Sequence, residues 1–222
     1  MKILLSCLLL LPLLAFSQDY PAEWFEEVPR SEAQSWEILP QDAGPGEVIL
    51  SKRTELGIFS NFGATPFVLD GRTYASIEGL WQSLKFPDPE IENDQRHAVA
   101  GWIHSRQEVE QMVGFEAKRA GDQANRIYRD NNLTQVNYGT TFFNYTDRGF
   151  GSDYHYMIIK RAMREKLDQT PGLWELLMKT GCLILKPDHF VNENSPPSFH
   201  YYKIYMLLRS ERLFAPCPYG KN

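Results

Sequence analysis

Short β-branched segments precede long helical patterns in this chain, and this order limits its fold more than any other feature. The segments are EVILSK at residues 47–52, GIFSNF at 57–62 and PFVLDGRTYA at 66–75. Each has the length and composition of a strand, and Asp70–Gly71 is a dipeptide typical of a two-residue hairpin. Later patterns are helical, except for a buried-strand pattern at 183–186. The order therefore favours an α+β fold over repeated βαβ units.

The helical patterns have recognisable start and stop signals. Ser76 stands where an N-cap is expected, and Pro87 ends the pattern that follows it. Ser105 and Glu108 fit a capping box, and Gly181 fits a C′ position. The predicted helices cover residues 76–86, 105–113, 115–131, 153–167, 170–180 and 199–213. We therefore expect a helix-rich single domain with a small antiparallel sheet.

The N-terminus has the pattern of an export signal. Lys2 precedes an apolar run that ends at Phe16, which is too short for a membrane-spanning helix and typical of a secretory signal peptide. We expect cleavage after Ser17 and export to the periplasm or the medium. Residues 18–46 form a predicted arm, residues 47–215 the domain and residues 216–222 a tail. No second long apolar run follows, so we expect no membrane contact after cleavage.

Charge, cysteines and motifs narrow the possible functions. A net charge of −5 argues against a broad nucleic-acid-binding patch. Cys182 and Cys217 either form a disulfide in an oxidising compartment or remain two small buried side chains, and the sequence does not decide between these readings. The sequence has no GxGxxG, P-loop, HExxH or GxSxG motif, so we expect no cofactor and no metal.

Three separated blocks resemble one known family. SNF at 60–62, DGRTY at 70–74 and SIEGLWQSLKF at 76–86 form the first block, followed by residues 160–181 and by YMLLR at 205–209. In their order and spacing they resemble the NADAR (YbiA-like) family. The resemblance implies a compact, helix-rich α+β domain that holds an ADP-ribose-like or phosphoribosyl ligand. It also implies an N-glycosidase-type hydrolase that cleaves the N-glycosidic bond of that ligand.

Cleavage of a ribosyl C–N bond passes through an oxocarbenium-like state, so it needs a carboxylate near the anomeric carbon. Glu78 in the first block is the predicted catalytic carboxylate, although a glutamate in a first helical turn also complements the helix dipole. Asp188, after the late strand, is the predicted second carboxylate, although Pro187–Asp188 is also ordinary turn chemistry. His189 beside it is a weaker candidate, because a single histidine is usually structural.

The predicted substrate-binding residues surround Glu78 in the sequence. Lys85 lies two helical turns after Glu78 and is expected to meet a phosphate, and Gln82 between them suits a ribose hydroxyl. Aromatic residues of these blocks would stack on a base or pack in the core. The predicted binding set is Ser60, Asn61, Phe62, Trp81, Gln82 and Lys85.

Two other functions compete with the hydrolase. The histidine that usually follows the family's glutamate is Gly79 here, and a late Trp-Gly-Asp-type element is not visible. These departures favour a non-catalytic module that binds a nucleotide or ADP-ribose. A third reading is a structural exported protein that uses its arm for partner contact. The expected partner is a nucleotide-like or ribosyl small molecule, or an ADP-ribosylated macromolecule.

Overall fold

The computed structural model describes residues 20–213 and residue 217, so the predicted signal peptide, the predicted cleavage site and most of the tail lie outside the described residues. The described chain is helix-rich with short strands, which confirms the α+β fold class. Its helices are α1 (Ile77–Ser83), α2 (Arg106–Glu110), α3 (Gly114–Asp130), α4 (Phe150–Gln169), α5 (Leu173–Lys179) and α6 (Tyr201–Ser210). Its strands are β1 (Glu47–Ile49), β2 (Phe67–Leu69), β3 (Arg72–Tyr74), β4 (Val136–Tyr138), β5 (Thr141–Phe143) and β6 (Ile184–Lys186).

The described strands form three separate two-stranded pairs rather than the one antiparallel sheet that we expected. β2 and β3 form the predicted hairpin, whose turn residues Asp70 and Gly71 have φ of 49° and 81° as a tight hairpin requires. β4 and β5 form a second hairpin between the predicted helices at 115–131 and 153–167, where we predicted no strand. β1 pairs in parallel with the predicted late strand β6, with Val48 opposite Leu185. The parallel pair joins the start of the domain to its end.

Two predicted elements are wrong in detail. Residues 57–62 are not a strand: a 3-10 helix covers Glu55–Phe59, and its N-cap Thr54 accepts a hydrogen bond from the Leu56 amide. The predicted helix at 105–113 ends early, since α2 stops at Glu110, and α3 begins at Gly114, which takes a φ of 54°.

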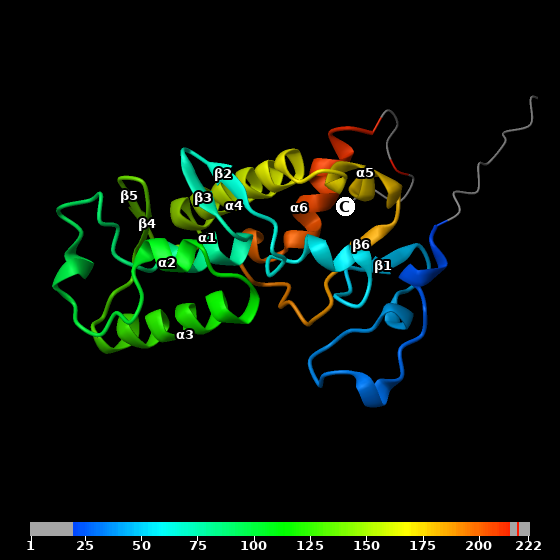
Figure 1. The fold of residues 1–222 in the computed structure, drawn as a ribbon, viewed down its shortest axis with the longest axis horizontal. Helices are drawn as coiled ribbons and strands as arrows, with labels where there is room; N and C mark the ends of the chain where they lie inside the picture. The colour runs from blue at the N-terminus through cyan, green and yellow to red at the C-terminus, as the bar shows by residue number, and fades with distance from the viewer. Residues whose placement is uncertain (1–19, 214–216, 218–222) are drawn as a thin grey trace, which may run out of the picture.

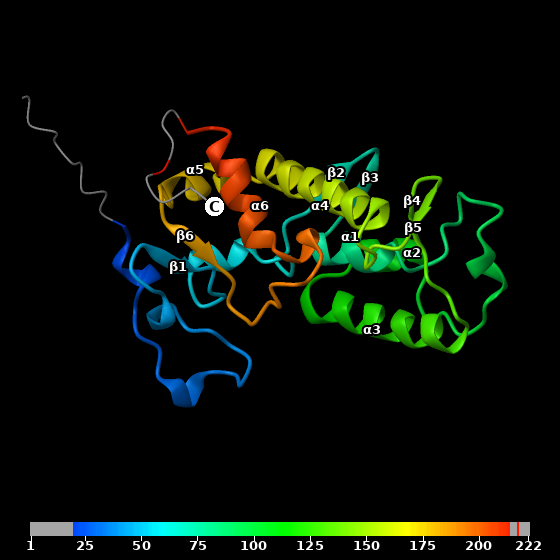
Figure 2. The same cartoon turned by 180° about the vertical axis from the view of Figure 1, so that it is seen from behind.

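Helix α1 is the centre of the fold. All seven of its residues are buried, and it packs against α2, α3 and α4. Figures 1 and 2 show α1 with α3 on one side and α4 on the other. The face of α3 toward α1 has small side chains, Ala117, Ala120, Gly121 and Ala124, which allow the two helices to approach closely. Polar residues of α1 are thus held in a rigid, largely buried setting.

The predicted arm is packed on the domain. Trp24 is fully buried in the main core and donates a 2.9 Å hydrogen bond to Glu55. Farther along, Ile38 donates its amide to the Asp188 carbonyl over 2.8 Å, and Glu37 forms an isolated antiparallel bridge with His189. The arm therefore lies against the loop that follows β6. No helix among the described residues has the length and hydropathy needed to cross a membrane.

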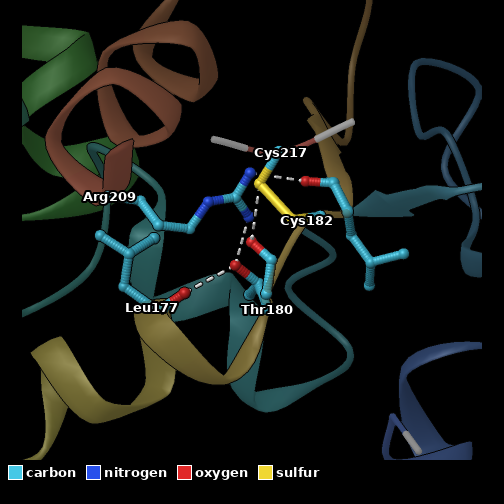
Figure 3. The surroundings of a disulfide bond; sticks show 7 residues. Leu177, Thr180, Cys182, Arg209 and Cys217 are labelled. Atoms are coloured by element: carbon cyan, nitrogen blue, oxygen red, sulfur yellow. Dashed lines mark hydrogen bonds between the residues drawn. A yellow bond between two sulfur atoms is a disulfide. The ribbon is translucent and has the colours of Figure 1, made fainter. Parts of the chain in front are cut away.

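A disulfide joins Cys182, after α5, to Cys217, so the structure favours the first of the two readings of these cysteines. Figure 3 shows the bond beside Arg209 of α6 and Thr180 at the end of α5. Arg209 donates to the Thr180 hydroxyl over 2.5 Å and to the Leu183 carbonyl over 2.8 Å. The bond and the arginine together tie the chain beyond α6 to the turn between α5 and β6.

Candidate functional site

A cavity of about 620 Å³ opens beside α1, between α3, the arm and the loop after β6. Seven of the eight predicted site residues line this cavity, although they come from two separate segments of the sequence. They are Ser60, Asn61, Phe62, Glu78, Trp81, Gln82 and Lys85. The structure therefore brings together the SNF loop (residues 60–62) and one face of α1. The chemical roles of these residues stay predictions.

Glu78 is fixed at the start of α1 by backbone and side-chain contacts. The Ser76 hydroxyl caps the helix by accepting from the Gly79 amide over 2.9 Å and donates to the Met112 carbonyl over 2.9 Å. The Glu78 amide donates to the Asn61 carbonyl over 2.9 Å, which joins the helix start to the SNF loop. Glu78 itself is 7% exposed. Its carboxylate is therefore rigidly placed and almost removed from solvent.

Three side chains form a hydrogen-bonded row along α1. Gln82 Nε2 donates to Glu78 Oε1 over 2.7 Å, and Lys85 Nζ donates to Gln82 Oε1 over 2.7 Å. Residues four and three apart on a helix lie on one face, so this row follows from the sequence spacing. The amide of Gln82 thus separates the carboxylate from the ammonium group.

Burial changes the protonation of both ends of this row. Burial raises the pKa of Glu78, and this effect exceeds the opposing effects of the Gln82 hydrogen bond and the Lys85 charge. Burial lowers the pKa of Lys85 to about 8, although the charge of Glu78 opposes it. Burial thus shifts both pKa values toward the neutral form of each group, and perturbed pKa values of this kind are typical of functional sites.

Lys166 of α4 binds the backbone of the SNF loop and of the residues before it. Its Nζ is fully buried and donates to the Ile58 carbonyl over 2.6 Å and to the Ser60 carbonyl over 3.0 Å. Burial lowers the pKa of this lysine to about 7. The side-chain oxygen of Asn61 is buried without a hydrogen-bond partner, although Asn61 lines the cavity. An unpaired buried acceptor is costly, so a donor on a ligand would stabilise it.

Trp81 is a wall of the cavity rather than a free stacking surface. It is 7% exposed, and its ring contacts His155 and Phe199 edge to face at centroid distances of 4.3 and 4.8 Å. Burial lowers the pKa of His155 to about 3, so this histidine is neutral at physiological pH. The alternative that Trp81 belongs to the core therefore fits the structure better than stacking on a base.

Asp188 is the predicted site residue that the structure does not bring to the cavity. Its carboxylate is 1% exposed and pairs with Lys52 and, over 2.8 Å, with His189 Nδ1. Burial raises its pKa, but the hydrogen bonds from His189 and Lys52 outweigh burial and hold the pKa below its usual range. Both partners line the cavity. Asp188 therefore positions two lining residues instead of reaching the ligand space itself.

The sequence reasoning missed an entire wall of the cavity. Helix α3 contributes one polar and aromatic face, Phe115, Lys118, Asp122 and Asn125. The spacing of these residues, three or four apart, was the available signal. The arm contributes Trp36, loops contribute Tyr145 and Phe190, a 3-10 helix contributes Phe199 and the start of α6 contributes Tyr201. These residues come from regions without a motif, so only the folded chain shows that they share a cavity with Glu78.

Two glycines allow this arrangement. A Cβ at Gly121 of α3 would lie 1.7 Å from Gln82 Oε1, so this glycine makes room for the amide in the row. A Cβ at Gly79 would lie 2.6 Å from the Met112 carbonyl oxygen. Residue 79 therefore faces α2, and it is not among the residues that line the cavity. The absence of a side chain at this position therefore serves the contact between α1 and the turn after α2 and leaves the cavity wall unchanged.

No family model matches the sequence, and no curated protein matches it. Among solved structures, the chain is similar to the NMR structure of the Escherichia coli protein YbiA, with a TM-score of 0.46 and 20% sequence identity. The alignment covers 80% of this chain and 89% of that chain. At this level of likeness, function has to be argued from the cavity and its residues.

Proposed function

We propose that this protein is an N-glycosidase-type hydrolase that cleaves a ribosyl C–N bond in an ADP-ribose-like or phosphoribosyl substrate. The observation that carries the proposal is the position of Glu78. Its carboxylate lies in a ligand-sized cavity, is almost fully buried, and is hydrogen-bonded to a neutral amide rather than directly paired with a cation. Burial strengthens the electrostatic attraction between such a carboxylate and a developing positive charge.

The residues on α1 have complementary roles in this reaction. As the C–N bond breaks, its electron pair leaves with the nitrogen base, and Glu78 stabilises the positive charge at the anomeric carbon. A water molecule then bonds to that carbon and gives a proton to the carboxylate. The raised pKa of Glu78, caused by burial, favours proton acceptance. Gln82 and Lys85, the other two members of the row, each keep at least one hydrogen-bond donor that is free to bind a ribose or phosphate oxygen.

Asn61 and Ser60 would hold the ligand at the SNF loop. The unpaired Asn61 oxygen suits a ribose hydroxyl, because that hydroxyl is a donor. Lys166 fixes the loop through the Ile58 and Ser60 carbonyls, so the position of this acceptor depends on α4. This arrangement resembles a preorganised binding site more than a flexible surface loop.

A non-catalytic module that binds a nucleotide or ADP-ribose is the second candidate. One observation favours it: among the described residues, the cavity offers no second free carboxylate beside Glu78. Asp188 does not line the cavity, and Asp122, which does, is paired with Lys118 over 2.9 Å. Many glycosidases use two carboxylates, so a cavity with Glu78 alone suits binding without catalysis. Turnover distinguishes the two candidates.

The test uses the mature chain, residues 18–222, with its disulfide intact. It is incubated with NAD, ADP-ribosylated nucleic acid and a phosphoribosyl compound, and release of base and ribose is followed by mass spectrometry. Product from one of these substrates supports the hydrolase. Calorimetric binding of ADP-ribose without any product would support the binding module instead.

Export is part of the proposal. The signal-like residues 1–17 support it, and so does the disulfide between Cys182 and Cys217, because such bonds persist in oxidising compartments. The mass of the chain recovered from outside the cytoplasm tests this point. We expect a chain that begins at Gln18, and recovery of the full-length chain from the cytoplasm alone would contradict export.

A further inference from the structure

The rim of the cavity has exposed aromatic side chains that the proposed reaction does not use. Phe190 is 82% exposed and Trp36 is 44% exposed, and both line the cavity. Large exposed aromatic groups beside a cavity commonly mark a contact surface for a ligand or partner. Trp81, by contrast, is 7% exposed. A stacking surface therefore lies at the rim, outside the α1 motif.

Backbone contacts next to Trp36 and Phe190 join the arm to the loop after β6. Glu37 of the arm forms an antiparallel bridge with His189, and Ile38 donates its amide to the Asp188 carbonyl over 2.8 Å. Trp36 precedes Glu37 and Phe190 follows His189, so this contact brings two aromatic residues that are far apart in the sequence to the same cavity. The arm is therefore a structural part of the cavity.

A cation lies beside Trp36. Lys52 Nζ is 5.2 Å from the centroid of the Trp36 ring and 5.8 Å from that of Phe62. Asp188 pairs with the same ammonium group, which fixes its position, while a third of the lysine side chain stays exposed. An ammonium group has three donors, so Lys52 keeps donors for an anionic group of a ligand. Aromatic surface and fixed cation together suit a nucleotide.

We propose that Trp36, Phe190 and Lys52 form a subsite for a nucleoside 5′-phosphate group, with the flat heterocycle against the two rings and the phosphate at Lys52. The inference rests on the proposed function, because it names the part of the same substrate that contacts the arm rather than α1. Base–aromatic stacking tolerates different bases, so the subsite selects for a flat ring and a phosphate rather than for one base.

Calorimetry with three probes separates the two parts of this subsite: AMP, adenosine and ribose 5-phosphate. Trp36→Ala and Phe190→Ala should each weaken AMP and adenosine binding by about fivefold or more, since stacking on an aromatic side chain contributes at least that much. Binding of ribose 5-phosphate should stay within about twofold, because it lacks the ring. Trp36→Phe keeps a ring and should recover most of the affinity for AMP.

Lys52→Gln should weaken AMP and ribose 5-phosphate but leave adenosine, whereas Lys52→Arg should keep all three affinities. Phe150→Ala is the matched control, because Phe150 is 64% exposed and does not line the cavity. Unchanged AMP affinity in both aromatic-to-alanine variants would overturn the inference, as would a wild-type protein that binds neither AMP nor adenosine at millimolar concentration. Ring-dependent AMP binding without turnover of any ribosyl substrate would leave the subsite standing and remove the hydrolase.

Discussion

Gln82 Nε2 donates a 2.7 Å hydrogen bond to Glu78 Oε1, one helical turn away on α1. The other end of the same amide accepts from Lys85, so Gln82 holds a carboxylate and an ammonium group apart on one helix face. Glu78 therefore keeps a neutral donor instead of a direct cationic partner. The Glu78 carboxylate is therefore able to accept a proton. The position of the Gln82 amide depends on Gly121 of α3, because a side chain there would overlap with the amide.

Gly121→Ala should displace the Gln82 amide, because the new Cβ would lie 1.7 Å from its oxygen. We expect hydrolysis to fall by about 10- to 100-fold, the scale of loss when catalytic groups move by about an ångström. Initial rates at saturating substrate measure this loss. Glu116→Ala is the control on the same helix, since Glu116 is exposed and does not line the cavity. Wild-type rates in both variants would show that the position of Gln82 is irrelevant.

Gly79→His, the residue that the family pattern suggests, should destabilise the fold instead of improving activity. A Cβ at position 79 would meet the Met112 carbonyl at 2.6 Å and the Glu110 carbonyl at 3.1 Å. Overpacking of this kind costs about 1–3 kcal/mol. Chemical denaturation should show a smaller loss for Gly79→Ala than for the histidine variant. A histidine variant as stable as the wild type would contradict the close packing of α1 against α2.

The stability of the wild-type protein should rise between pH 7 and pH 9 through Lys166. Burial lowers the pKa of Lys166 to about 7, whereas an unfolded lysine stays protonated well above pH 9. In this window the unfolded chain holds a proton that the folded chain has lost. Each such group therefore raises the free energy of unfolding by up to about 1.4 kcal/mol per pH unit. Lys166→Met should reduce the slope of unfolding free energy against pH. Lys203→Met, at an exposed lysine, should not.

Removal of the disulfide by Cys182→Ala with Cys217→Ala should cost about 2–4 kcal/mol, because the bond closes a long loop of the unfolded chain. Neither cysteine lines the cavity, so AMP affinity should stay unchanged in the folded variant. Denaturation of the wild type with and without a reducing agent gives the same comparison. Equal stability in both conditions would show that the bond adds nothing.

The sequence predicted α1 and its functional face because local signals were sufficient there. Ser76 marks the helix start, and the spacing of Glu78, Gln82 and Lys85 puts three polar groups on one face. The hairpin at Asp70–Gly71 was equally local, since only the turn residues set it. Patterns of this kind are decided by neighbours in the sequence, so they need no knowledge of the tertiary fold.

Other features depended on contacts between distant segments. We predicted Asp188 as a site residue, but its carboxylate pairs with Lys52, which is far away in the sequence. It therefore positions Lys52 and does not contact the ligand space. Trp36 joins the cavity through the bridge between Glu37 and His189, which no local pattern indicates. The face of α3 had a readable spacing, but the position of that face over the cavity depends on the break at Gly114.

Glu78→Gln tests the central claim most directly. A neutral amide keeps the shape and the hydrogen bond from Gln82 but can neither stabilise a positive charge nor accept a proton from water. Burial raises the pKa of Glu78, so the folded chain holds a proton that the unfolded chain loses as pH rises above about 4.5. The carboxylate therefore costs stability at pH 7, and Glu78→Gln should be at least as stable as the wild type.

The measurement is single-turnover release of base from the best ribosyl substrate, for wild type, Glu78→Gln and the control Glu116→Gln, which alters another first-turn glutamate. We predict a loss of about 100-fold or more for Glu78→Gln, the scale of general acid–base catalysis, with wild-type rates for the control. Wild-type rates from a folded Glu78→Gln protein would contradict the account.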